Sequence, residues 1–282
     1  SFMNLAFLRH SMPTTEIAIG NNLLIFDWIS DLVRLNKSFI VKRNTGMREA
    51  LQAAKQLSGY IHHAILDKKQ SVWIAQREGR AKDSSDHTQE ALIKMLALGG
   101  HSGTFIDNLK EVNLLPVSIS YEYDPNDYLK AREFLLKRRD PNFKKSQRDD
   151  LFSMETGLLQ HKGKVHFQMT PRINQKLDQI GDFKDTNVAA HNVVRIIDQA
   201  IHRSYEIFEV NYIAFDLLNK TNRFERKYTS EQKEQFIDYL NTQLDKVDVQ
   251  DVTTEERDYM MTLMLTMYSN PLKIKLHTIL GE

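Results

Sequence analysis

Several charged residues and one glycine stand close together after an apolar stretch, and together they could bind an anion. They follow the apolar run 71–75 and comprise Arg77, Glu78, Gly79, Arg80 and Lys82. Arginine offers a planar fork of donors that suits a phosphate group, and glycine lets the backbone approach a ligand closely. A solvated loop, in which Glu78 and Arg80 form an ion pair, is the alternative interpretation.

A second basic residue, Arg43, ends another apolar run, 38–43. In parallel α/β sheets, ligands bind beyond the carboxyl ends of the strands. We expect strands 38–43, 71–75 and 115–121 to lie in one sheet, with the ends of the first two converging. Arg43 and Arg80 would then hold the same phosphate group.

The elements that must position these residues alternate between strand and helix over the first part of the chain. The stretches 16–20, 114–123 and 164–169 are also typical of strands, and 47–69 has the apolar spacing of a long helix. From about residue 185 onward the pattern is helical only. The sequence predicts an α/β fold with a mostly parallel sheet flanked by helices, followed by an all-helical C-terminal region.

We accordingly expect two domains, an α/β domain over 1–180 and a helical region over 181–282. The first residues are Ser-Phe-Met, from which we expect the α/β domain to be truncated at its N-terminus. The net charge of +1 gives no general attraction to nucleic acid or anionic lipid, so such binding would need a local patch. The absence of cysteine excludes disulfides and a cysteine nucleophile.

Four blocks, in this order, resemble the glycerolphosphate acyltransferase family. "FIVKRN" is similar to the family's strand that runs into an arginine, and "WIAQREGRAKD" to its block with Glu-Gly and an arginine. "LLPVSISYEYDP" is similar to a strand of the form Val-Pro-Val-x-Ile. "KGKVHFQMTPRIN" is similar to a later Gly-Lys-Val strand. The resemblance covers roughly residues 5 to 175.

The resemblance implies transfer of a fatty acyl group to a hydroxyl of glycerol 3-phosphate or lysophosphatidate in phospholipid synthesis. Acyl-acyl carrier protein or acyl-coenzyme A would be the donor, with no cofactor and no metal ion. The residues that it implies for the acceptor phosphate are Arg43, Glu78, Gly79, Arg80 and Lys82. It also implies a cytoplasmic protein that can lie on the inner face of the membrane.

The family's catalytic block, His-x-x-x-x-Asp, should precede Arg43 by some tens of residues, which places it upstream of Ser1. We therefore expect no catalytic residue in this chain, and little acyl transfer from it alone. The pattern does occur once, at His62 and Asp67, but it comes after Arg43 and inside a predicted helix. Side chains five positions apart on a helix point in different directions, so we interpret this match as a coincidence.

The segment 130–148 holds eight basic and two acidic residues, a local charge of 8 − 2 = +6. It is expected to be a solvated loop, and Leu135, Leu136 and Phe143 within it suggest peripheral contact with a membrane. Two other functions stay open. One is a non-catalytic protein of the same fold that binds phospholipid or another phosphate ester. The other, which we expect less, is a nucleic-acid binder that uses this basic segment.

Overall fold

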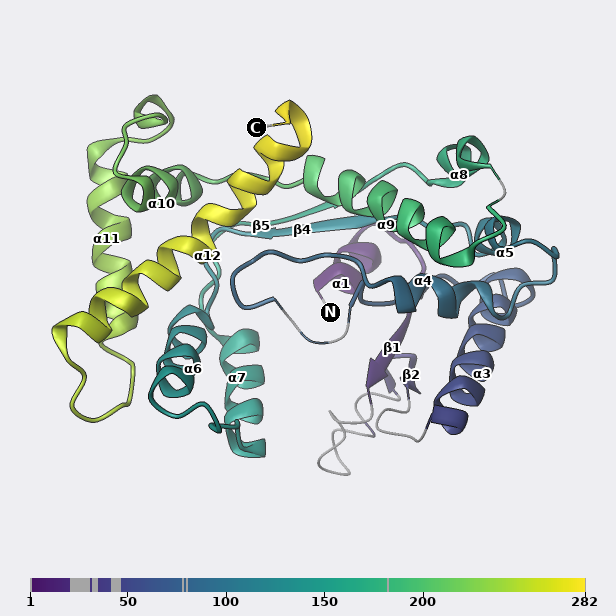
Figure 1. The fold of residues 1–282 in the computed structure, drawn as a ribbon, viewed down its shortest axis with the longest axis horizontal. Coiled ribbons are helices and arrows are strands. Elements are labelled where there is room, and N and C mark those ends of the chain that lie inside the picture. The colour runs from purple at the N-terminus through teal and green to yellow at the C-terminus, as the bar shows by residue number, and fades with distance from the viewer. Residues whose placement is uncertain are drawn as a thin grey trace. The chain divides into compact units, whose positions relative to one another are not determined.

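The computed structural model describes residues 2–20, 31, 35–41, 47–77, 79, 81–181 and 183–281. Over these residues the chain has an α/β fold (Figure 1), in which a three-stranded parallel sheet with its helices precedes a mostly helical C-terminal half. The fold class expected from the alternation of strands and helices is thereby confirmed.

The described residues form five strands and a larger set of helices. The strands are β1 (Glu16–Gly20), β2 (Ser38–Val41), β3 (Val72–Trp73), β4 (Val117–Tyr121) and β5 (Val165–Met169). The helices of the first half are α1 (Phe2–Arg9), α3 (Met47–Leu66), α4 (Glu90–Ala97), α5 (Phe105–Glu111), α6 (Asp127–Arg139) and α7 (Gln147–Leu159). Those of the second half are α8 (Asn174–Ile180), α9 (Thr186–Arg203), α10 (Glu209–Asn219), the 3₁₀ turn η2 (Glu225–Lys227), α11 (Ser230–Leu244) and α12 (Thr254–Leu280).

The chain divides into two compact units, each assembled from three segments. Unit 1 consists of Ser1–Gly79, His87–Pro116 and Met169–Ala200, and unit 2 of Arg80–Asp86, Val117–Gln168 and Ile201–Glu282. The units are therefore interleaved along the chain, whereas the domains expected from the sequence, 1–180 and 181–282, are continuous segments.

The parallel sheet of unit 1 has the strand order β2-β1-β3, with β1 in the centre. β1 pairs with both neighbours in parallel, and Ile17 lies opposite Ser38 on one side and Trp73 on the other. The expected strand 71–75 is therefore shortened to its two residues Val72 and Trp73, and the strand 38–43 ends at Val41 among the described residues.

The prediction that strand 115–121 joins this sheet is wrong. β4 forms a separate two-stranded sheet with β5. The amide of Glu122 donates to the carbonyl of Lys164 and that of Thr170 to the carbonyl of Pro116, so the two strands run antiparallel. Strand propensity shows which residues are extended but not which strand is their partner. A partner later in the chain forms the ladder here.

Helix α3 lies against the sheet of unit 1 and also contacts helix α4. Tyr60 of α3 packs edge-on against Phe39 of β2 at 5.0 Å between ring centroids, and its hydroxyl donates to Glu16 of β1 at 2.5 Å. A Cβ on Gly99, just after α4, would lie 2.5 Å from the backbone of Ser58. Only glycine allows the two chain segments to approach this closely.

Unit 2 has a core made mainly by α6, α10, α11 and α12. The last three belong to the C-terminal part of the chain, which Figure 1 colours green to yellow. The fully buried members of this core include Leu135, Phe236 and Met264. The prediction that 130–148 is a solvated loop is wrong over its first half, because α6 continues to Arg139 and buries Leu135 against this core. The apolar residues of α10, α11 and α12 pack against α6, and the local sequence of α6 does not reveal these partners.

Candidate functional site

β2 and β3 both run parallel to β1, so their carboxyl ends point in the same direction. They lie on opposite sides of β1, two strand spacings or about 10 Å apart. Trp73, the last residue of β3, is level with Ser38, the first residue of β2, so β2 continues three residues beyond the level at which β3 ends. The register therefore gives the two strands a common direction but offsets their ends.

Five residues were expected to form the phosphate site, and the structure describes two of them. Arg43, Glu78 and Arg80 lie outside the described residues. Their convergence on one phosphate group therefore stays a prediction. Gly79 and Lys82 are described, and their surroundings differ.

Gly79 has a left-handed backbone, with φ at +73°. A Cβ at this position would meet nothing within 4 Å, so glycine is favoured by the backbone conformation and not by lack of space. The chain before it is fixed within unit 1. Gln76 accepts a hydrogen bond from the amide of Gln89 at 3.0 Å and one from the hydroxyl of Thr88 at 3.3 Å. The chain after β3 is therefore held in place at Gln76, and at Gly79 its backbone has free space on the side where a Cβ would stand.

Lys82 lies on a short loop of unit 2 that is held at several points. The amide of Ala81 donates to the carboxylate of Asp86 at 3.2 Å, and Ala81 itself is buried. Asn270 of α12 donates to the carbonyl of Asp83 at 2.7 Å. These bonds fix the backbone on both sides of Lys82 and therefore determine where its side chain can reach.

The ammonium group of Lys82 contacts Glu133 of α6, together with two further lysines. Lys137 lies 2.9 Å from one carboxylate oxygen of Glu133, and Lys145 lies 3.2 Å from the other. Glu133 is only 4% exposed, whereas all three lysines reach solvent. The aromatic ring of Phe134 lies 5.9 Å from the Lys82 ammonium group. We call Lys82, Lys137, Lys145 and Glu133 the lysine cluster.

The charges in the lysine cluster shift its pKa values strongly. Burial alone would raise the pKa of Glu133, but hydrogen bonds from Lys82 and Lys137 and the charge of Lys145 outweigh it and bring that pKa to about 2. Burial lowers the pKa of Lys82, Glu133 raises it, and the positive charges of Lys137 and Lys145 lower it further. Glu133 is therefore ionised at neutral pH, and the lysines around it repel one another.

The sequence-based search did not find this cluster as a unit. The spacing of Glu133 and Lys137, four residues apart on a helix, is a readable signal for a local ion pair. The contact with Lys82 joins residues 51 positions apart and has no sequence signature. The prediction assigned Lys82 to a phosphate site with Arg43. That assignment stays a prediction, and the structure adds a carboxylate partner for Lys82 on α6.

The match to the catalytic pattern at His62 and Asp67 does not form a catalytic pair. His62 is 2% exposed, and its two ring nitrogens lie 3.0 Å from a carboxylate oxygen of Glu111 and 2.9 Å from the carbonyl of Leu96. Asp67 instead pairs with the neighbouring His63, and both of these side chains are exposed. His62 thus joins α3, α4 and α5 inside unit 1, where no acceptor hydroxyl can reach it.

A buried carboxylate in unit 2, Asp127 of α6, is also enclosed by its partners. Tyr268 and Tyr239 donate to one of its oxygens at 2.7 and 2.8 Å, and Gln243 donates to the other at 2.7 Å. Burial raises the pKa of Asp127 to about 6, although the hydrogen bond from Tyr268 lowers it. Asp127 is 0% exposed, so this network joins three helices and offers no access to a substrate.

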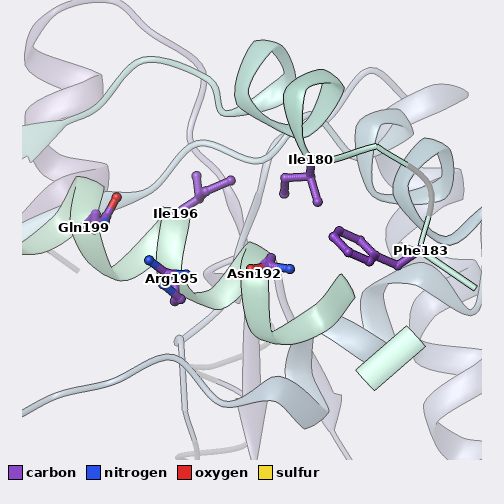
Figure 2. A pocket seen from close by; sticks show the side chains of 6 residues that line it. All are labelled: Ile180, Phe183, Asn192, Arg195, Ile196 and Gln199. Atoms are coloured by element: carbon purple, nitrogen blue, oxygen red, sulfur yellow. The ribbon is translucent and has the colours of Figure 1, made fainter. Parts of the chain in front are cut away.

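A small cavity of about 260 Å³ lies in unit 1 between α8, α9 and the chain that joins them. Figure 2 shows Ile180 and Phe183 on one side, facing Asn192, Arg195 and Ile196 of α9. The lining mixes apolar side chains with a guanidinium and amides. Among the described residues Arg195 has no ion-pair partner, but the volume is below the range usual for a ligand site.

The basic segment 130–148 is largely neutralised within unit 2. Four carboxylates from outside the segment pair with it, which are Asp124 with Lys130, Asp149 with Arg132, Glu255 with Arg138 and Glu256 with Arg139. Lys144 and Arg148 are exposed and form no ion pair with any described residue. They are the basic residues of the segment without a carboxylate partner among the described residues, whereas Lys137 and Lys145 share Glu133 with Lys82.

The described residues contain neither a metal-binding group nor a membrane-spanning helix. Among them no group of three or more histidine, aspartate or glutamate side chains is arranged to hold a metal ion. None of the helices described is both long and apolar enough to span a bilayer.

Comparison with known proteins returned no relative. No protein-family model matches the chain, and no curated protein and no solved structure is significantly similar to it.

Proposed function

We propose that this chain belongs to an acyltransferase that moves a fatty acyl group to a hydroxyl of glycerol 3-phosphate or lysophosphatidate. Its support is the order of the four sequence blocks together with one structural observation. The strands that lead into the Arg43 block and the Glu78–Arg80 block lie on either side of β1 and run in the same direction. The carboxyl ends of both strands therefore point the same way, and ligands of parallel sheets bind beyond such ends.

In this proposal the acceptor's phosphate is held by Arg43 and Arg80, whose planar guanidinium groups each offer two parallel donors. Glu78 accepts hydrogen bonds from the acceptor's hydroxyl groups, or orders the arginines. Gly79 supports this arrangement because its left-handed backbone, open on the side where a Cβ would stand, lets the ligand approach the chain. The acyl donor is acyl-acyl carrier protein or acyl-coenzyme A.

A second candidate function is binding of a phosphate ester without catalysis. The observation that favours it is the state of His62, since the sequence contains His-x-x-x-x-Asp only there and the imidazole is buried between Glu111 and Leu96. A general base usually accelerates such a reaction about 10² to 10⁴-fold. Residues 1–282 alone are therefore expected to bind the acceptor and to transfer acyl groups very slowly.

The test is calorimetric titration of residues 1–282 with glycerol 3-phosphate. Arg43→Ala and Arg80→Ala should each weaken binding roughly ten- to a hundred-fold, since a hydrogen bond to a charged group contributes about 1.5–3 kcal/mol. Arg80→Lys should recover only part of this, because an ammonium group does not reproduce the fork of donors. Arg138→Ala, whose guanidinium pairs with Glu255, is the matched control and should leave the affinity unchanged.

If neither Arg43→Ala nor Arg80→Ala changes the affinity, the charged stretch after β3 is a solvated loop and the proposal fails. Rapid acyl transfer by residues 1–282, measured with acyl-coenzyme A, would contradict the expectation of slow chemistry. It would then make the region of His62 and Asp67 worth re-examination.

A further inference from the structure

The lysine cluster carries more positive charge than its own carboxylate neutralises. Three ammonium groups surround one carboxylate, which leaves a local excess of 3 − 1 = +2. Lys82 and Lys137 contact the same oxygen of Glu133, so their like charges are forced close together. The fold holds this repulsion in place, and an anion at the open side of the cluster would relieve it.

The cluster is built into the fold of unit 2 and is still accessible. Glu133 is 4% exposed on α6, and the Lys82 loop is held through Ala81 and Asp83. The side chains of Lys82, Lys137 and Lys145 are 34%, 47% and 28% exposed. Each lysine therefore has one contact fixed by Glu133, while the remaining hydrogens of its ammonium group can be offered to a ligand.

We propose that Lys82, Lys137 and Lys145 form a binding site for a phosphate monoester group, with Glu133 holding the three ammonium groups in place. The site is built by α6, by the loop 81–86 and by the segment that connects α6 to α7. It uses neither Arg43 nor Arg80. The inference therefore goes beyond the proposed function, and inorganic phosphate alone is enough to test it.

The charge of the cluster selects the class of ligand. A phosphate monoester carries about −1.5 to −2 at pH 7 and offers three strong acceptor oxygens, one for each lysine. A carboxylate or a phosphodiester carries −1 and would leave the site half neutralised. The three cations gather around one carboxylate, that of Glu133, whereas a nucleic-acid strand needs a row of them along its backbone.

The first experiment titrates inorganic phosphate into residues 1–282 at constant ionic strength, with chloride as the balancing anion. Binding should be saturable, and it should be weaker at pH 5.5 than at pH 7.5, because protonation moves the charge of phosphate from about −2 towards −1. Lys137→Met and Lys145→Met should each weaken it roughly tenfold or more, as expected for loss of a charge-assisted hydrogen bond. Lys144→Met removes the same charge one residue away from Lys145, and it should change nothing.

A second variant keeps the test valid if a lysine substitution disturbs folding. Glu133→Gln changes the local charge from +2 to +3 and should tighten phosphate binding, provided that circular dichroism shows a folded protein. A purely structural role for the cluster predicts lower stability for this variant without tighter binding. The proposal is overturned by the absence of saturable binding to the unmodified chain, or by equal losses in Lys144→Met and Lys145→Met.

The same phosphate chemistry occurs in a soluble ester and in a lipid headgroup, and a third arm separates them. Glycerol 3-phosphate is titrated beside vesicles of phosphatidylcholine that contain either phosphatidic acid or phosphatidylglycerol. If glycerol 3-phosphate binds more tightly than either kind of vesicle, the site takes a soluble ester. Preference for phosphatidic acid, a monoester, over phosphatidylglycerol, a diester, assigns it to a lipid. Equal binding of both lipids, which Lys145→Met leaves unchanged, contradicts the proposal.

The outcomes for the lysine cluster and for the acyltransferase proposal can be told apart. Loss of phosphate binding in Lys145→Met with normal binding in Arg43→Ala supports the lysine cluster and counts against the site proposed with Arg43 and Arg80. Loss in Arg43→Ala with normal binding in Lys145→Met supports the site of Arg43 and Arg80 and overturns the cluster.

Discussion

His62 shows how a residue pattern and its surroundings can lead to different interpretations. Its two ring nitrogens both face acceptors, the carboxylate of Glu111 and the carbonyl of Leu96. Glu111 also accepts from Ser102 and from the amide of His101, and its pKa lies below the usual range: burial raises it, but these hydrogen bonds outweigh that effect. Such a histidine stabilises a junction between helices and has no nitrogen available as a base.

His62→Ala is expected to lower the free energy of unfolding of residues 1–282 by about 2–3 kcal/mol, because a buried carbonyl and a charged group lose their partner. Asp67→Ala should leave stability within the scatter of the measurement, since the pair of Asp67 with His63 is exposed. Urea denaturation measures both variants. A stable Asp67→Ala protein that loses acyl transfer would contradict the structural role and restore the catalytic interpretation.

At the residue level, the sequence indicates what a side chain or a backbone can do, but it does not indicate which residue becomes its partner. Gly79 was expected to let the backbone approach a ligand, which stays a prediction, and the structure shows that its backbone is left-handed. Lys82 was expected to face a phosphate group, yet its nearest charged group is Glu133. The conformation of a glycine is a local property of the chain, whereas an ion pair depends on a second residue that the fold brings near.

Helix α6 shows what an element contributes beyond its charges. One face buries Leu135 and Asp127 among the helices of unit 2, and another carries Arg138 and Arg139, which pair with Glu255 and Glu256 at the start of α12. The sequence of α6 is too rich in charge to show a clear apolar stripe, which is why the segment was expected to be a loop. The acidic partners lie more than a hundred residues away, so the local pattern does not reveal that the charges are satisfied.

Asp127 should give unit 2 a distinct dependence on pH. Its pKa is raised from 3.8 to about 6, so the folded state binds the proton more tightly than the unfolded chain. The contribution of Asp127 to the free energy of unfolding is therefore full below pH 4 and is lost as the pH rises from about 4 to about 6. The free energy lost is about 3 kcal/mol at most, because each pKa unit corresponds to about 1.4 kcal/mol.

Asp127→Asn should lack this dependence, because the amide does not ionise. Its carbonyl oxygen can still accept from the tyrosine hydroxyls, while its NH2 group faces the donor of Gln243. Urea denaturation of both proteins between pH 4 and 7 measures it. The stability of the variant relative to the unmodified chain should rise between pH 4 and 6 and then stay constant. A difference that is independent of pH would mean that the hydrogen bonds from Tyr239 and Tyr268 offset the effect of burial.

At the scale of the whole molecule, the sequence predicts the class of fold because the class follows from local patterns. Alternating strands and helices indicate an α/β layer, and the uniform helical pattern after residue 185 indicates the helical half. The pairing of β4 with β5 and the interleaving of two units depend on contacts between distant segments. Three of the five candidate phosphate-binding residues lie outside the described residues, so for them the resemblance to the acyltransferases is the main guide.

Most basic residues of the segment 130–148 contact carboxylates within unit 2. Of the segment 130–148, proposed for peripheral contact with a membrane, Lys144 and Arg148 are exposed without an ion pair to a described residue. A basic residue near an anionic membrane contributes about 1 kcal/mol. Any contact through this segment should therefore depend on these two residues more than on Arg138 and Arg139.

Replacing both Lys144 and Arg148 by serine should weaken binding to phosphatidylglycerol vesicles roughly thirtyfold, from the sum of two such contributions. Replacing Arg138 and Arg139 by serine changes the net charge equally, but those residues are neutralised by Glu255 and Glu256, so the affinity should change much less. Sedimentation with vesicles at about 0.1 M salt, where exposed charges act over about 10 Å, measures both. Equal losses would show that only net charge matters, and no binding of the unmodified chain would end the proposal of membrane contact through 130–148.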